Sequence, residues 1–151
     1  MFQVETQFTQ DSKACPGVRF TMRVLNQYQR AIRDSKIVDA RTRISELSAK
    51  YSALPDPDGD PTMPSAEAAR LRIERNTIDH RLGLVITTEL KPAYIRASLV
   101  GIEGLHLNPE PVTTTADPWG GLIGNAPDEL LDEIYTAAVQ NSGLSGEQEK
   151  N

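Results

Sequence analysis

Residues 54–64 read LPDPDGDPTMP, and this segment limits the fold more than any other because it holds four prolines. Proline has no backbone N–H and disfavours helical geometry in the residue before it, so a helix cannot run through the segment. The helical patterns on either side must therefore belong to separate helices. We predict helices over 26–53 and 65–90, joined by a stiff, solvated Pro/Asp linker at 54–64, and expect them to pair as an antiparallel hairpin.

The first predicted helix is amphipathic, because its apolar residues recur at spacings of three, four or seven. Asn26 stands where it can cap this helix. The apolar stripe consists of Tyr28, Ala31, Ile32, Ile37, Val38, Ile44, Leu47 and Tyr51. We expect the residues of this stripe, including Tyr28 and Tyr51, to lie in the core.

The second predicted helix follows Pro64, and Ser65 is placed to cap it. Its apolar stripe consists of Ala69, Leu71 or Arg72, Ile73, Ile78, Leu82 and Val85, with Gly83 weakening the later part. Pro92 fits the first turn of a third helix, which Gly104 would end. The apolar face of that third helix would carry Tyr94, Ile95, Leu99 and Ile102.

The N-terminal residues follow a different period, because apolar and polar residues alternate. The two alternating apolar sets are Phe2, Val4, Thr6 and Phe8, and then Val18, Phe20, Met22 and Val24. A period of two predicts half-buried strands, and Pro16 and Gly17 in the connection favour a turn. We therefore predict an antiparallel β-hairpin over 1–25 that needs a helix or a further strand on its apolar face.

The remaining residues predict a C-terminal helical part over 92–143. LHLNPEPV reads as extended or turned, and Asp117-Pro118 begins a turn that Gly120 and Gly121 keep short. The last helix begins near Asn125 and Pro127 and ends at Gly143, with an apolar face of Leu130, Leu131, Ile134, Ala137 and Val139. The predicted fold is α+β, mostly α: one hairpin and about four helices in a single domain over 1–143, with a flexible tail at 144–151.

Size and charge favour an ordinary globular protein. The chain has 151 residues, enough for one domain, and no apolar run approaches the roughly 18 residues that span a membrane. Its N-terminus lacks the features of a signal peptide, and Cys15 has no second cysteine to pair with, so we expect a cytosolic protein.

The net charge of −5 is distributed unevenly. Residues 1–53 carry nine Lys or Arg and five Asp or Glu, giving +4, whereas residues 105–151 carry one Lys and eight Asp or Glu, giving −7. The basic part mixes both signs and has no Lys/Arg block with interleaved aromatic residues, so nucleic-acid binding is disfavoured. The two ends of opposite sign can attract each other within one molecule or between copies.

The aspartates of the linker resemble the start of a calcium loop. Asp56, Asp58 and Asp60 alternate, but Gly59 precedes the third aspartate instead of following it as in an EF-hand. The glutamate at the twelfth position, Glu67, already belongs to the predicted helix. We therefore interpret the segment as a linker.

No other group of residues predicts a catalytic, cofactor or metal site. His80 reads as a surface residue of a helix and His106 as the polar face of a short strand, and neither stands at ligand spacing to Cys15. GGLIGN has no Lys and follows no strand, so it reads as a flexible turn and not as a phosphate loop. Asp132 and Glu133 are adjacent on a helix and point apart. The sequence thus favours a protein that works through its surface.

The order of several segments resembles a known family. PGVRFTMRVLNQYQRAIR is similar to the opening of small tail assembly chaperones of tailed bacteriophages, in which a strand of the form PGV-x-F-T-x-R runs into a helix rich in Arg and Gln. KPAYIRASLVGIEGLHLNPEPVTT resembles their P-x-x-x-R…I-x-G-L-x-I segment, which a short acidic helix like APDELLDEIYTAAV follows. GLSGEQEKN resembles their charged close. The resemblance covers most of the chain, apart from 54–64.

This resemblance implies a non-enzymatic protein of the host cytoplasm that binds the tape-measure protein and helps to assemble the tail-tube protein. It implies no cofactor, metal, nucleic acid or membrane, and leaves homo-oligomers open. The large aromatic residues that could anchor a partner are Trp119, Tyr28 and Tyr51. Trp119, predicted to lie on a loop between Pro118 and Gly120, is the best of these candidates.

Three other interpretations stay open. The chain could be a structural part of the virion tail, such as a head–tail connector, a tail-completion subunit or a baseplate-associated subunit. It could be a small enzyme or metal-dependent regulator that uses the aspartates of 54–64, in which case replacing all three by Ser should abolish its function. Composition alone supports no more than a protein that interacts with other proteins.

Overall fold

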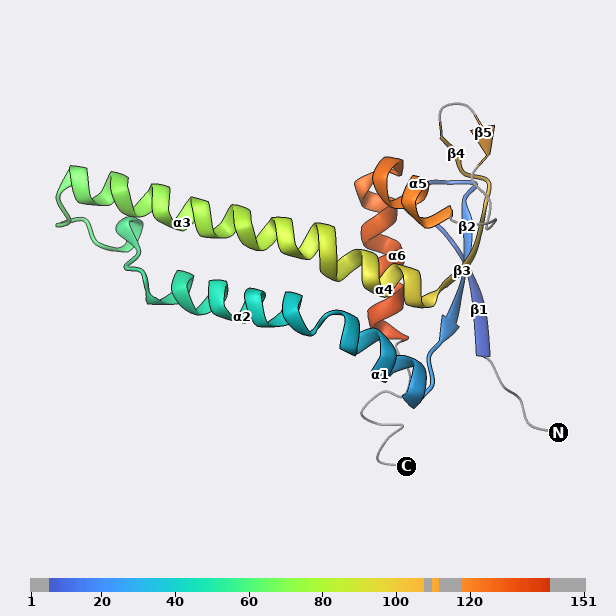
Figure 1. Cartoon of the computed structure of the whole chain (residues 1–151). Helices are drawn as coiled ribbons and strands as arrows, with labels where there is room; N and C mark the ends of the chain where they lie inside the picture. The colour runs from blue at the N-terminus through green and yellow to red at the C-terminus, as the bar shows by residue number, and fades with distance from the viewer. Residues whose placement is uncertain (1–5, 108–109, 112–117, 142–151) are drawn as a thin grey trace. The chain divides into compact units, whose positions relative to one another are not determined.

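The computed structural model describes residues 6–107, 110–111 and 118–141. These residues form the predicted α+β fold, which is mostly helical and opens with a β-hairpin (Figure 1). The chain divides into two compact units, one of residues 36–91 and the other of residues 1–35 and 92–151. The expectations for Phe2, Val4, Asp117, Gly143 and the tail 144–151 lie outside the described residues.

The unit formed by residues 1–35 and 92–151, which we call the first unit, contains a three-stranded antiparallel sheet in the order β1-β2-β3. The predicted hairpin is β1 (Thr6–Asp11) and β2 (Arg19–Val24), with Phe8 opposite Met22. The third strand, β3 (Leu99–Glu103), pairs with β2 and places Ile102 opposite Phe20. It supplies the further strand that a lone hairpin needs.

Strand β3 corrects the prediction that Leu99 and Ile102 belong to a helix. Helix α4 spans Lys91–Ser98 and stops before them. Both side chains are buried, and a strand pairs their backbone with β2, whereas a longer helix would leave the edge of β2 unpaired. Gly104 consequently ends a strand and not a helix.

A close approach of two backbone segments explains why Gly104 is a glycine. Its φ is +80°, in the left-handed region, and a Cβ built on it would lie 2.2 Å from the carbonyl oxygen of Gly17. Gly17 itself has φ +91° in the β1–β2 connection, as predicted for a turn. A side chain at 104 would therefore force the two turns apart.

Helix α6 (Asp128–Gln140) packs against β2, and α4, α5 and α6 lie on the same side of the sheet (Figure 1). The largest fully buried side chains of this unit are Phe20, Met22, Ile95, Leu99, Leu122, Leu130 and Ile134. Burial of Leu130, Ile134 and Ala137 confirms the predicted face of the last helix. Val139 is 45% exposed, however, and the neighbouring Ala138 is buried instead, because Ala138 follows Ile134 by four residues and so stays on the buried face.

The glycine-rich segment before α6 is helical, which corrects its interpretation as a flexible turn. Helix α5 spans Pro118–Asn125, with Pro118 at its first position, and includes GGLIGN. Burial of Leu122 holds this glycine-rich helix in place despite its poor intrinsic propensity. The extended segment is confirmed as β4 (His106–Leu107) paired with β5 (Glu110–Pro111).

The helix predicted over 26–53 is interrupted. Helix α1 spans Gln27–Lys36 and α2 spans Val38–Ala53, with Ile37 between them at φ −114° and ψ 10°. The hydroxyl of Ser35 donates to the carbonyl of Ile32 at 2.7 Å and competes with helical bonding there. The apolar residues on either side of Ile37 therefore do not form one continuous stripe.

The second unit is the predicted antiparallel hairpin, in which α2 and α3 (Ser65–Val85) run side by side (Figure 1). The linker contains a 3₁₀ turn, η1 (Pro57–Gly59). Ser65 is the first residue of α3 and not its cap, because Pro64 occupies the N-cap position, and no side chain caps the helix there.

The face that α3 turns towards α2 differs in part from the predicted stripe. Leu71 and Val85 are buried, as is Ala68, and Ile78 and Leu82 are half-buried. Ala69 and Ile73, both predicted to be apolar contacts, are exposed, and Ile73 is 68% exposed.

The helical backbone continues beyond α3 through a π-helical segment, η2 (Ile86–Leu90), into α4. The backbone N–H of Lys91 bonds to the carbonyl of Ile86, five residues back. The wider turn precedes Pro92, which has no N–H and whose ring would clash with a regular helical turn. The predicted break between the second and third helices is therefore a change of helix type.

Candidate functional site

Helix α1 begins with a reciprocal cap. The Asn26 side chain accepts a hydrogen bond from the Gln29 backbone N–H at 2.8 Å, and the Gln29 side chain accepts one from the Asn26 backbone N–H at 2.9 Å. This arrangement is a capping box, and it confirms the cap predicted at Asn26. The first turn of α1, which carries Tyr28, is thus held by two bonds.

The one buried side chain of α1 is an arginine. The guanidinium of Arg33 lies 4.4 Å from the centroid of the Tyr94 ring and pairs with Asp34 at 2.9 Å. Tyr94 in turn packs edge-on against Tyr135 of α6, with ring centroids 5.5 Å apart. The buried contact that ties α1 to α4 is thus a guanidinium stacked on a ring and not an apolar side chain.

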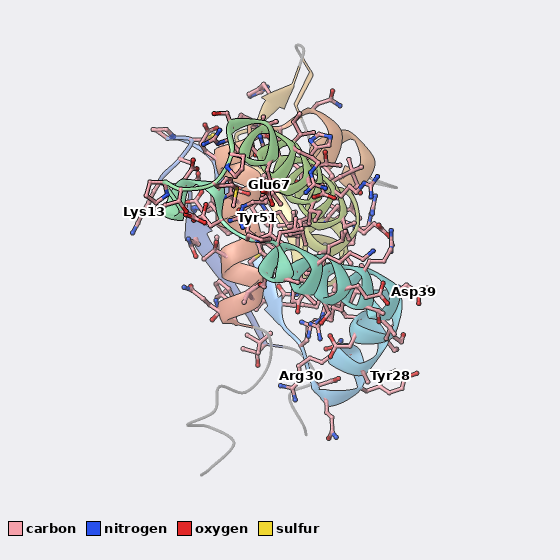
Figure 2. The ribbon with its side chains drawn as sticks, turned by 90° about the vertical axis from the view of Figure 1, so that its left-hand side faces the viewer. Lys13, Tyr28, Arg30, Asp39, Tyr51 and Glu67 are labelled. Carbon is pink, nitrogen blue, oxygen red and sulfur yellow. The ribbon has the colours of Figure 1, made fainter. Side chains whose placement is uncertain are left out.

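The apolar side chains of α1 lie on its exposed side. Tyr28 is 74% exposed, Ile32 is 41% exposed, and Ala31 is exposed as well. Spacings of three and four residues place these three residues on one face, which we call the apolar face of α1. Figure 2 shows Tyr28 projecting outward from the helix, and a shallow depression beside it is lined by Asn26, Gln27, Tyr28 and Ala31.

This face corrects the expectation that Tyr28 lies in the core. The sequence pattern placed Tyr28 and Ile32 on the same stripe as Ile37, but only Ile37 is buried. The buried position on α1 is taken by Arg33, which sequence reasoning missed, because an arginine is rarely buried without a partner. Nothing in the sequence near Arg33 marks Tyr94 as that partner, since the two residues are far apart along the chain.

Tyr51 is half-buried and already engaged within its own hairpin. The Arg75 guanidinium lies 4.3 Å from the centroid of its ring and donates to its hydroxyl at 3.0 Å. A second donor of Arg75 reaches the carbonyl of Leu54 at 3.2 Å, at the C-terminal end of α2. Tyr51 therefore stabilises the hairpin unit, whereas Tyr28 and Trp119 belong to the other unit.

Trp119 lies in the first turn of α5, which corrects its predicted place on a loop. Its side chain is half-buried, so part of the ring reaches solvent. Of the three aromatic residues predicted to anchor a partner, Tyr28 is thus the most exposed.

The carboxylates of the linker make local bonds. Asp56 accepts from the backbone N–H of Asp58, and Asp58 accepts two bonds from Arg72 of α3, at 2.9 and 3.2 Å. Asp60 accepts from the hydroxyl and the backbone N–H of Thr62, and these bonds hold the pKa of Asp60 below its ordinary value. The three carboxylates are therefore used to shape the turn between α2 and α3.

The other titratable candidates are dispersed. His80 is exposed on α3 and His106 is exposed on β4, as predicted, and Cys15 is half-buried in the β1–β2 connection. Glu133 accepts bonds from the Ser12 hydroxyl at 2.5 Å and the Lys13 backbone N–H at 2.7 Å, which tie that connection to α6. Within the described ranges, no group of three or more His, Cys, Asp or Glu could hold a metal ion.

No helix within the described part of the chain is both long enough and apolar enough to cross a membrane. A comparison with protein-family models finds no match, and no curated protein or solved structure matches the chain. Tyr28, on the apolar face of α1, is the most exposed large hydrophobic side chain among the described residues.

Proposed function

We propose that this protein is a non-enzymatic assembly chaperone for a bacteriophage tail, which binds a helical segment of the tape-measure protein on the apolar face of α1. The resemblance of PGVRFTMRVLNQYQRAIR to the opening of such chaperones supports the family. The exposure of Tyr28, Ala31 and Ile32 within that same segment carries the proposal, because it supplies a surface for a client.

An exposed apolar face on a fixed helix suits a helical client. An amphipathic helix places its apolar residues at spacings of three and four, which match the spacing of Tyr28, Ala31 and Ile32. Tyrosine contributes a large contact area with few rotatable bonds, and its hydroxyl can stay in water at the rim of an interface.

The stacked Arg33 would keep this face free for a client. If α1 were held by its apolar residues, they would be buried against the rest of the chain and could bind nothing else. The stacking of Arg33 on Tyr94 instead holds the helix from another side. The same argument makes Arg33 a positioning residue for the proposed site.

Light scattering on the purified protein, alone and mixed with the tape-measure protein of the same genome, tests the proposal. A large soluble co-complex is expected, and the protein should be absent from purified virions. Recovery of the protein from virions at a fixed copy number would instead identify it as a structural tail component. A Tyr28→Ser/Ile32→Ser variant should lose the complex, whereas Val139→Ser, which alters an exposed apolar residue of α6, should keep it.

A further inference from the structure

A second exposed stripe runs along α3, in the hairpin unit. Ile73 is 68% exposed, Leu84 is 55% exposed, and Thr77 and His80 between them are exposed as well. Their spacings of four, three and four residues keep all four on one side of the helix. We call Ile73, Thr77, His80 and Leu84 the outer stripe of α3.

The outer stripe lies on the side of α3 away from α2. Arg75 marks the inner side, because it contacts Tyr51 and Leu54 of the other helix. Ile73 and Arg75 are two positions apart, which turns their side chains about 200° from each other around the helix. Thus α3 has two sides with coiled-coil spacing, of which α2 covers only one.

The outer stripe is complementary to itself in an antiparallel arrangement. Its four residues are placed symmetrically about the midpoint between Ile78 and Asp79, so a twofold axis there brings Ile73 onto Leu84 of a second copy. The same axis brings Thr77 onto His80, and each contact occurs twice. The Thr77 hydroxyl already donates to the Ile73 carbonyl of its own helix at 2.8 Å, so it needs no partner in such an interface.

The charges that flank the stripe complement each other in the same arrangement. Glu74 and Arg81 are seven residues apart, so both lie along the same edge of the stripe. When two helices pack antiparallel, this edge of one helix lies against the same edge of the other. Glu74 of one copy therefore faces Arg81 of the other, twice. The hairpin unit, residues 36–91, carries nine Lys or Arg and nine Asp or Glu, so two copies have no net charge to repel each other.

Gly83, on the other edge of the stripe, independently indicates that a second helix packs there. It lies inside α3, where glycine destabilises a helix relative to alanine. A Cβ built at this position meets no atom of the chain within 4 Å, so the packing of the described chain does not require a glycine. A second helix approaching closely along this edge would require one, since a small residue lets two helix backbones come together.

From these observations we infer that the outer stripe of α3 is a dimer interface, on which the α3 helix of a second copy packs antiparallel. This interface uses a different helix from the proposed client site and does not depend on the proposed function.

Sedimentation equilibrium of the full chain, between roughly 10 µM and 1 mM, tests the interface. We expect a concentration-dependent dimer that Leu84→Glu weakens at least about tenfold, whereas Val139→Glu on α6 leaves it unchanged. Gly83→Ala should make the helix more stable in thermal unfolding followed by circular dichroism and yet weaken the dimer. A purely local role for Gly83 cannot move these two readouts in opposite directions.

A charge swap tests the antiparallel register. Glu74→Arg and Arg81→Glu should each weaken the dimer, and the double variant should restore it to within about threefold, because both pairs are re-formed with reversed sign. In a Cys15→Ser background, Ile73→Cys/Leu84→Cys should form a disulfide between copies, whereas Ile73→Cys alone should not. A chain that stays monomeric throughout, a dimer that Leu84→Glu does not affect, or cross-linking by Ile73→Cys alone would overturn the inference.

Discussion

The contacts of Arg75 predict a measurable coupling between the two helices of the hairpin. Arg75 donates to the Tyr51 hydroxyl and the Leu54 carbonyl and stacks on the Tyr51 ring at 4.3 Å. Because the side chains of Arg75 and Tyr51 are half-buried, solvent screens these contacts, so we take the value of an ordinary hydrogen bond for each bond and the lower part of the usual range for the stacking. A bond from a charged donor then contributes about 1 kcal/mol and the stacking about 0.5–1 kcal/mol.

These contributions predict distinct effects for different substitutions. Arg75→Met removes all three contacts while retaining most of the aliphatic bulk, so it should lower the free energy of unfolding by about 2–3 kcal/mol. Tyr51→Phe removes only the hydroxyl bond and should cost about 1 kcal/mol. Tyr51→Leu also removes the ring and should cost about 2 kcal/mol.

A double-mutant cycle isolates the interaction between Arg75 and Tyr51. Urea unfolding of the wild type, Arg75→Met, Tyr51→Leu and the double variant, followed by far-UV circular dichroism, should give a coupling energy of about 1–2 kcal/mol. Equal slopes against urea concentration across the four proteins would show that the same transition is being compared. A coupling below about 0.3 kcal/mol would refute the reasoning, because the two side chains would then stabilise the hairpin independently.

Other substitutions test the remaining packing and electrostatics. Leu130→Ala empties a fully buried position and should cost about 2–5 kcal/mol in urea unfolding, whereas Val139→Ala on the exposed side of the same helix should cost less than about 0.5 kcal/mol. Gly104→Ala should lower the melting temperature by several degrees, about 1–3 kcal/mol in free energy, because φ +80° and the nearby backbone both oppose a Cβ. Thr62→Val removes one of two bonds that lower the pKa of Asp60, so this pKa should rise in an NMR titration of the carboxyl group. Since the folded pKa of Asp60 lies below the unfolded value of about 3.9, its stabilising contribution is complete above that pH and is lost as the pH falls through the folded pKa; an unchanged titration in Thr62→Val would contradict this assignment.

The elements that follow from local rules were predictable from the sequence. The prolines of 54–64 separate the helices, and Asn26 caps α1. The alternation through Phe20 and Met22 gives a strand with one buried face. Each of these signals acts over a few residues, so no knowledge of the rest of the chain is needed.

The misassigned elements depend on contacts between distant residues. Leu99 and Ile102 fit a helical spacing, but pairing with β2, about 80 positions earlier in the chain, makes them a strand. Leu122 holds a glycine-rich helix that local propensity disfavours. In both cases tertiary packing outweighs a local preference.

The candidate site was predictable only in part. That Tyr28 anchors a partner stays a prediction, and the sequence pattern favoured its burial, whereas its side chain is exposed. Its exposure depends on the stacking of Arg33 on Tyr94, which a helical period cannot reveal. The outer stripe of α3 was not predicted for a similar reason, because the sequence pattern placed Ile73 on the apolar stripe that was expected to pack against the first helix.

The most direct test of the proposed function is a titration of the tape-measure protein of the same genome with this protein, followed by light scattering. Wild-type protein and Val139→Ser should form the same soluble co-complex, and Tyr28→Ser/Ile32→Ser should fail to form it while keeping the wild-type circular dichroism spectrum. No complex with wild-type protein, or a complex that the α1 variant still forms, would contradict the assignment of a client site to the apolar face of α1.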